Sequence, residues 1–417
     1  MILRARAIWA RKERIIRDGA LQVCGDKIGQ IGHRDDVLPG VGESLVDLGE
    51  SIIFPAFVNA HCHLDFTGLA GELSPGESFA DWVKQIVEIK RSLTLEDHES
   101  AWLNGAEMLV RTGCATVANI ESVPELFVRM AAQTPLQVCP FTELIGFHEN
   151  DEESALDLAK RELTNNKPFS LVAGLSPHAP YTTTPGLLSE VAGFADEHDV
   201  PVAIHVAESE DEWRMFTSGE GALSENMKAL GRHPGDCGQS TPVEHVSRSR
   251  GLAKRTLVIH ANYLGAEDSI FLAKPGTSVV HCPRSHAWFG YEPFEYERLA
   301  KAGANICLGT DSLASAGGAG SVVELNMFDE MRTFRRQHPK VPAADIIEMA
   351  TMNGAIALGL QNVLGQLEGG SLANLGVIPL PNPLADVSEA ILDHPGPVGS
   401  LLIAGKRVFS GRNSIAN

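Results

Sequence analysis

Two histidines separated by one residue, His61 and His63, follow an apolar run that extends from Ser51 to Val58. The apolar run predicts a buried strand. Side chains at positions i and i+2 of a strand point the same way, so both imidazoles should project together from its C-terminal end. Imidazole nitrogens are common ligands of divalent metals, and the pair therefore suggests part of a metal site. Two polar residues in a turn are the alternative interpretation, so further ligands must come from elsewhere in the chain.

Other predicted strands end in similar residue types. Chance placement explains one histidine at a strand end, but six of eight strands ending in histidine or aspartate favour one shared site. Besides His61 and His63, the residues at or just beyond these ends are His178, His205, His260, His281 and Asp311.

The donor types predict which metal would bind. His61, His63 and His205 offer neutral nitrogen ligands, and Asp311 offers a carboxylate. That set suits zinc or iron(II). A catalytic ion of this kind keeps a position for water, whose pKa falls toward about 7 on zinc. We predict one divalent ion, with Zn²⁺ as first choice and Fe²⁺ as the alternative.

Two further residues could handle protons. Glu208 lies three residues after His205 and can reach a substrate without binding metal, which suits a proton shuttle. A surface acid among Glu208, Glu210, Asp211 and Glu212 is the alternative interpretation. His260 could polarise an attacking water, or it could orient a metal ligand instead.

The elements that would position these residues alternate between short β-rich runs and longer helical patterns. Eight strands alternating with helices predict a (β/α)₈ barrel, in which catalytic groups lie at the C-terminal ends of the strands. A doubly wound sheet usually has a glycine-rich turn after its first strand, where this chain has histidines. The predicted strands are Ile52–Asn59, Thr116–Ile120, Gln137–Ile145, Ser170–Leu175, Val200–Val206, Leu257–His260, Ser278–His281 and Ala304–Leu308. The predicted helices include Phe79–Arg91, Leu95–Arg111, Ser154–Leu163, Pro185–His198, Ala222–Leu230, Pro293–Lys301 and Val322–Phe334.

Both ends of the chain differ from this central segment, because they contain short predicted strands separated by residues that favour turns. We predict an α/β protein with a TIM-barrel catalytic domain over residues 53–364 and a small β-sandwich domain built from residues 1–52 plus 365–417. Barrel hydrolases with two metals often carry a bridging lysine on the fourth strand. Ser170–Leu175 has none, which favours a single metal. The segment Gly317–Gly320 is interpreted as a turn that leads into a helix.

Composition limits the partners. The chain of 417 residues has 53 acidic and 34 basic residues and a formal net charge of −19, which disfavours binding to nucleic acid. No stretch predicts a membrane span. Seven cysteines without a CxxC pattern suggest reduced thiols in a cytoplasmic protein. We expect a small-molecule substrate, no membrane or nucleic-acid partner, and a sequence compatible with a homo-oligomer.

The motifs PAFVNAHCHLD, SPHAPYT, IHVAES, VIHANYL, HCPRSH and LGTDS together resemble the amidohydrolase superfamily, specifically its mononuclear deaminase branch. This resemblance covers nearly the whole chain. It implies one zinc or iron ion held by His61, His63, His205 and Asp311. It also implies Glu208 as proton shuttle, with His260 and Asp311 helping to activate water.

Within that branch, SPHAPYT is similar to methylthioadenosine/S-adenosylhomocysteine deaminases and guanine deaminases, and implies that His178 contacts the substrate. HCPRSH followed by Trp288-Phe289-Gly290, together with FADWV, looks more like aminodeoxyfutalosine deaminases of the menaquinone pathway. Other candidates for substrate contact, each weighed against simple loop packing, are Trp82, Glu143, Arg284, His286, Phe289 and Ser312.

The predicted reaction is hydrolytic removal of ammonia from the exocyclic amine of a purine nucleoside-like substrate, with 6-amino-6-deoxyfutalosine or another adenosine derivative as the preferred candidate. Hydrolysis of a triazine or a cyclic amide with the same metal and Glu208 is one alternative. A non-catalytic metal-binding scaffold is an alternative of another class. Such scaffolds tend to lose ligands, and none is missing here.

Overall fold

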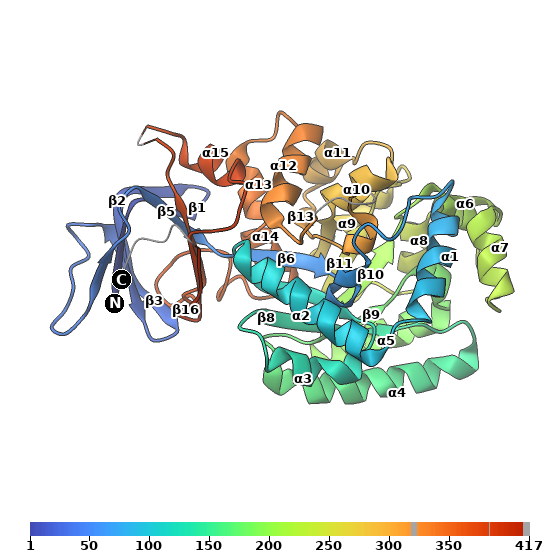
Figure 1. Cartoon of the computed structure of the whole chain (residues 1–417). Coiled ribbons are helices and arrows are strands. Elements are labelled where there is room, and N and C mark those ends of the chain that lie inside the picture. Colours follow the sequence, from blue (N-terminus) through green and yellow to red (C-terminus); the bar gives the residue numbers. More distant parts are fainter. Residues whose placement is uncertain (318–322, 383, 412–417) are drawn as a thin grey trace.

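The computed structural model describes residues 1–317, 323–382 and 384–411 (Figure 1). One of its two sheets contains eight parallel strands in the order β13-β12-β11-β10-β9-β8-β7-β6, with helices on its outer side. The predicted (β/α)₈ barrel is therefore confirmed. Its strands are β6 Phe57–Cys62, β7 Cys114–Glu121, β8 Gln137–Leu144, β9 Gly174–Pro177, β10 Val202–Val206, β11 Thr256–His260, β12 Thr277–His281 and β13 Asn305–Leu308.

The barrel closes between β13 and β6, at the C-terminal ends of both strands. The backbone N–H groups of Thr310 and Asp311 donate to the carbonyl of His61 at 3.0 and 3.1 Å. A Cβ atom on Gly309 would lie 2.9 Å from the His61 Cβ, so glycine permits this close approach. Closure therefore places Asp311 directly beside His61.

Helices surround the barrel. The first turns of several are capped by side chains, such as Thr94 on α2 and Ser209 on α6. Among described residues, no helix is both long and apolar enough to cross a bilayer. The helices are α1 Phe79–Lys90, α2 Leu95–Arg111, α3 Phe127–Ala131, α4 Glu149–Asn166, α5 Pro185–His198, α6 Glu210–Ser218, α7 Ala222–Ala229, α8 Pro242–Arg248, α9 Asp268–Leu272, α10 Pro283–Phe289, α11 Tyr296–Ala302, α12 Met327–Gln337, α13 Ala343–Met349, α14 Met352–Ala357 and α15 Val387–Leu392.

Strands from both ends of the chain pair in the second sheet, which lies to the left of the barrel in Figure 1. A sheet built from both ends of the chain, as expected, is therefore confirmed. Its order is β16-β15-β14-β5-β1-β2-β3, with β4 paired to β1. The strands are β1 Ile2–Arg11, β2 Arg14–Cys24, β3 Lys27–His33, β4 Leu45–Asp47, β5 Ser51–Pro55, β14 Leu375–Pro379, β15 Ser400–Ile403 and β16 Lys406–Ser410.

Several predicted boundaries differ from the structure, and three of the differences have a clear local cause. The run Ile52–Asn59 divides at Ala56, because Ala56 donates its N–H to Asn374 in the terminal sheet, and the barrel strand begins after it. The fourth strand begins at Gly174 rather than at Ser170, since a 3₁₀ turn at Lys167–Phe169 is followed by bends and irregular chain as far as Ala173. Helix α12 begins only after Asn326, whose side chain accepts from the Phe328 N–H. Residues 318–320 of the predicted turn Gly317–Gly320 lie outside the described residues. Residue 322, at which the last predicted helix begins, also lies outside them.

Candidate metal centre and adjoining pocket

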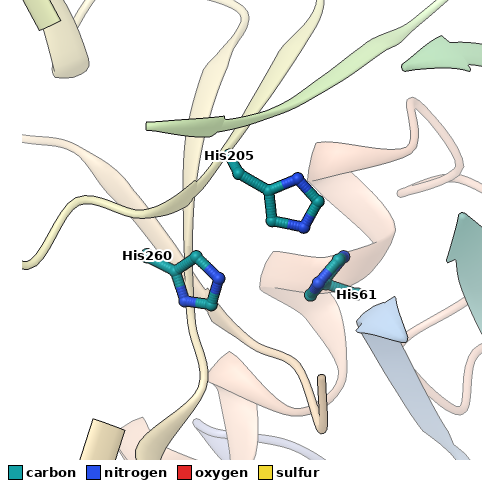
Figure 2. A group of neighbouring side chains, drawn as sticks. All are labelled: His61, His205 and His260. Atoms are coloured by element: carbon teal, nitrogen blue, oxygen red, sulfur yellow. The ribbon is translucent and has the colours of Figure 1, made fainter. Parts of the chain in front are cut away.

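The predicted ligands meet at the C-terminal end of the barrel. Figure 2 shows the imidazoles of His61, His205 and His260 pointing toward one another. One donor atom from each lies within 4.8 Å of the others, and the same holds for His61, His63 and Asp311. All five side chains are buried. The structure thus gathers the four residues proposed as ligands, with His260 close enough to share the same centre.

A backbone carbonyl orients His205. Its Nδ1 lies 2.8 Å from the carbonyl oxygen of His178, and because a carbonyl only accepts, Nδ1 must carry the hydrogen. Nε2 is then left with a free lone pair, 3.3 Å from His63 Nε2. Burial lowers the pKa of His205 to about 4, helped by the charge of His61. The ring is therefore neutral near pH 7 and presents a metal-binding nitrogen.

Two hydroxyl groups hold Asp311. Its Oδ2 accepts hydrogen bonds from Ser285 at 2.8 Å and from Ser315 at 3.2 Å, which leaves Oδ1 facing His61 Nε2 at 3.5 Å. Burial alone would raise the pKa of Asp311, but the interaction with His61 and the charge of His260 hold it well below its ordinary value. Asp311 is therefore a carboxylate with one oxygen free for a cation.

The donor set fits one divalent ion. Within the described part of the chain, both ring nitrogens of His61 are buried without a hydrogen-bond partner. Buried polar atoms normally have partners, and a cation among these residues would satisfy His61, His63, His205 and Asp311 together. Three imidazoles and one carboxylate are donors that zinc and iron(II) accept.

Glu208 lies beside this centre, just after β10. Its Oε1 is 3.6 Å from His260 Nε2, and the side chain is buried. Burial, followed by the negative charges of Asp311 and Glu212, raises the pKa of Glu208 well above its ordinary value of 4.5. A carboxyl group in this state holds its proton more tightly than an exposed one and can act as a proton donor.

The backbone that carries Glu208 is held by Glu212, which is fully buried in the first turn of α6. The Glu212 carboxylate accepts from the N–H groups of Ala207 and Glu208 at 2.9 and 2.8 Å. Ala207 has a φ of 55°, a left-handed conformation that a residue with a Cβ rarely adopts. Asn262 adds a third restraint by donating to the Glu208 carbonyl at 2.9 Å.

Replacing Glu212 by glutamine should therefore loosen this turn. The amide oxygen can replace only one of the two acceptors, so we expect the free energy of unfolding to fall by about 1–3 kcal/mol. Denaturant unfolding of the variant measures the change, and a crystal structure shows whether Glu208 moves. The exposed Glu210→Gln variant is the matched control; equal stability of the two variants would contradict the role given to Glu212.

A largely apolar pocket opens onto the candidate metal centre. His63, His205, His260 and Asp311 form its floor together with Glu208. Four of the residues predicted to contact substrate also line it, namely Trp82, Glu143, His178 and Ser312.

Three other predicted contact residues do not line this pocket. Arg284 is held by Glu330, whose carboxylate lies 3.7 Å from the guanidinium, and it donates to the carbonyl of Glu324. His286 donates from Nε2 to the Glu292 carbonyl at 2.9 Å. Phe289 lies behind the pocket wall, with its ring centroid 5.4 Å from that of Trp82.

His281 also faces away from the pocket, although it ends a barrel strand. Its ring is fully buried and stacks on Phe294 with the centroids 3.9 Å apart. Successive side chains of a strand point to opposite faces, so a histidine at a strand end can face the surrounding helices instead of the barrel axis. Position at a strand end therefore does not by itself decide whether a histidine enters the site.

The sequence interpretation missed the wall that α1 supplies. One stripe of this helix lines the pocket, and its apolar spacing resembles that of an ordinary core helix. The sequence contained one sign that this stripe faces more than core, since it ends in a basic residue, Lys90. The missed lining residues of this wall are Phe79, Val83, Ile86, Val87 and Lys90 on α1, together with Phe66 on the 3₁₀ helix Leu64–Leu69.

Comparison with known proteins agrees with this geometry. The family model described as "Amidohydrolase family" matches residues 52–408. A 5-methylthioadenosine/S-adenosylhomocysteine deaminase of Nitratidesulfovibrio vulgaris Miyazaki F is 30% identical, over 95% of this chain and 88% of the relative. An aminodeoxyfutalosine deaminase of Deinococcus radiodurans is 27% identical, over 82% of this chain and 81% of the relative. The solved structure of Helicobacter pylori aminofutalosine deaminase with methylthio-coformycin matches with a TM-score of 0.85 and 23% identity, over 98% of this chain and 100% of that one.

Proposed function

This chain belongs to the amidohydrolase family, and from that premise we propose that it deaminates a purine nucleoside by hydrolysis, releasing the exocyclic amine as ammonia. As a family member it is a hydrolase of carbon–nitrogen bonds other than peptide bonds. The observation that carries the proposal is the position of Glu208. A buried carboxyl group with a raised pKa lies between the candidate metal centre and an apolar pocket.

The chain's own residues supply the proton transfers. Glu208 would donate its proton to the ring nitrogen next to the amine-bearing carbon, which makes that carbon more electrophilic. His260 and Asp311 would accept the proton that the attacking water loses. The carbon–nitrogen bond then breaks, and the amine leaves as ammonia after it takes the one proton held by His260 and Asp311. The second proton of the water, released as the carbonyl forms, returns to Glu208, while the proton that Glu208 gave stays on the ring nitrogen. Each of these three residues lines the pocket, so all can reach one bound ring.

The ion would be held by His61, His63, His205 and Asp311, and it would supply Lewis acidity that makes water a nucleophile near neutral pH. We propose Zn²⁺, since three neutral imidazoles and one carboxylate are a common zinc donor set, and Fe²⁺ is the alternative. The orientation of His205 by a backbone carbonyl is the type of outer contact that metal-binding histidines usually have.

For the substrate we propose 6-amino-6-deoxyfutalosine, and hence a role in menaquinone biosynthesis. The relative from Deinococcus radiodurans supports this choice, as does the FADWV motif, whose Trp82 lines the pocket. Aromatic and apolar side chains on α1 would cover a large aromatic substituent better than a small polar one. Methylthioadenosine and S-adenosylhomocysteine are the closest competitors, because the relative from Nitratidesulfovibrio vulgaris is named for them.

A screen for ammonia release tests this function. Metal-loaded enzyme would be offered adenosine, methylthioadenosine, S-adenosylhomocysteine, aminodeoxyfutalosine, guanine and a chlorinated triazine, with ammonia and chloride both measured. We expect ammonia from the adenosine derivatives, with the highest kcat/KM for aminodeoxyfutalosine. Chloride release from the triazine without deamination of any nucleoside would replace our proposal with the triazine hydrolase alternative.

A further inference from the structure

Lys90 is the last residue of α1 and lies on the helix face that lines the pocket. Trp82, Ile86 and Lys90 are spaced four residues apart, so they share one face of the helix. The helix is held over the barrel at its other end. There the Ala80 N–H donates to Asp211 at 3.0 Å, and Asn226 donates to the Ala80 carbonyl at 3.0 Å. These hydrogen bonds fix α1 and, with it, the position of the end that carries Lys90. The helix lies beside α6 and α7 in Figure 1.

Lys90 is the only lysine or arginine among the described residues that line this pocket. Its ammonium lies 4.9 Å from the ring centroid of Phe66, and that ring stacks on the imidazole of His63 with centroids 5.5 Å apart. Among the described residues, the ring of Phe66 therefore lies between the Lys90 ammonium and His63, one of the proposed metal ligands.

Within the described part of the chain, the Lys90 ammonium makes no hydrogen bond or ion pair. The face of Phe66 offsets part of the cost of holding a cation in a largely apolar wall, but a ring attracts a cation less strongly than a carboxylate does. The indole Nε1 of Trp82, on the same helix face, is buried and also has no hydrogen-bond partner among the described residues. The α1 wall thus offers donors that nothing in the described chain accepts.

Glu143 offers a competing explanation for Lys90. It also lines the pocket, and its pKa is raised by burial while the charge of Lys90 acts to lower it. Among the described residues, however, no ion pair joins the two groups, and Lys90 acts on Glu143 only through its charge. If Lys90 served only to neutralise Glu143, its loss would affect every substrate alike.

We propose that Lys90 binds an anionic group on the substrate, carried by the substituent remote from the reacting amine. This inference rests on the proposed nucleoside deamination and names the class of nucleoside: one whose substituent ends in a carboxylate beside an aromatic or apolar segment. The apolar face of α1 would cover that segment, and Lys90 would pair with the carboxylate. Lys90 is then a residue that determines specificity and takes no part in the proton transfers.

A matched pair of substrates tests the role of the charge: aminodeoxyfutalosine, which ends in a benzoate, and its methyl ester, which has nearly the same shape without the charge. The variants are Lys90→Gln, Lys90→Arg and the control Arg91→Gln, which removes the same charge from the exposed neighbouring residue. We expect Lys90→Gln to lower the ratio of kcat/KM for the acid over the ester by about 10- to 100-fold. Lys90→Arg should keep most of the ratio, and Arg91→Gln should keep all of it.

The possible failures can be distinguished. Equal losses on acid and ester in a metal-loaded, folded Lys90→Gln protein would overturn the anion-binding role and favour neutralisation of Glu143. A wild-type enzyme that deaminates nucleosides but prefers the ester to the acid would overturn the inference and leave the proposed function standing. Wild-type enzyme inactive on every nucleoside would overturn both.

Discussion

Glu208→Gln is expected to retain the metal and lose most turnover. Glutamine has the same shape but no proton to give to the substrate ring, and losing a general acid–base group lowers kcat by about 10²- to 10⁴-fold. Glu208 does not orient any of the four proposed ligands, because His205 is oriented by a backbone carbonyl and Asp311 by two serines. Metal content should therefore equal that of the wild type. Steady-state kinetics and metal analysis on the same preparation measure both quantities.

The control for this variant is Glu210→Gln, two residues further on and exposed. It makes the same substitution in the same segment without touching the pocket, so its kcat should equal that of the wild type. A metal-loaded Glu208→Gln protein with wild-type kcat would remove Glu208 from the mechanism. Such a result would leave the metal centre intact and would direct attention to His260 as the proton donor.

His61→Ala is expected to lose the metal and with it all measurable activity. His61 belongs to two groups of residues whose donor atoms lie within 4.8 Å of one another, so its removal takes a donor from both groups. Losing an outer partner of a ligand typically weakens metal binding by about 10- to 100-fold, and losing a ligand should cost more. Treating the wild type with a chelator should give the same inactive state, and adding back Zn²⁺ should restore activity to the wild type only.

Folding should survive this substitution. Neither ring nitrogen of His61 makes a hydrogen bond within the described part of the chain, so alanine removes packing but breaks no such bond. Metal analysis and thermal unfolding together separate loss of metal from loss of fold, with the exposed His33→Ala variant as control. Stoichiometric metal in a folded His61→Ala protein would exclude His61 as a ligand.

Much of the fold was predictable because its signals are local. Alternating apolar strands and amphipathic helices predict the barrel, and each strand's polar end is visible beside its apolar run. The division at Ala56 was not visible, since it depends on Asn374, more than three hundred residues away, accepting the Ala56 N–H. Strand boundaries that depend on distant partners cannot be obtained from local propensity.

The candidate site was predictable only in part. Parallel strands bring their C-terminal ends together, so residues such as His61, His205 and Asp311 could be associated from sequence alone. Which way each side chain faces was not decided by position: His281 packs among helices, and Arg284 reaches Glu330 instead of the pocket. These choices depend on strand twist and on neighbouring helices, which the sequence near each residue does not specify.

The two histidines in alternate positions determined the chemistry, because residue types fix what can bind a metal or carry a proton. Sequence by itself therefore predicted the proposed donor set, the proposed acid Glu208 and the barrel that brings them together. Only the tertiary structure decided how these residues are held: Asp311 by two serines, His205 by a carbonyl, and Glu208 on a strained turn held by Glu212. It also placed Lys90 in the pocket wall. The sequence of α1 has the apolar spacing of an ordinary core helix, so only its packing against the barrel shows that one of its faces lines a pocket.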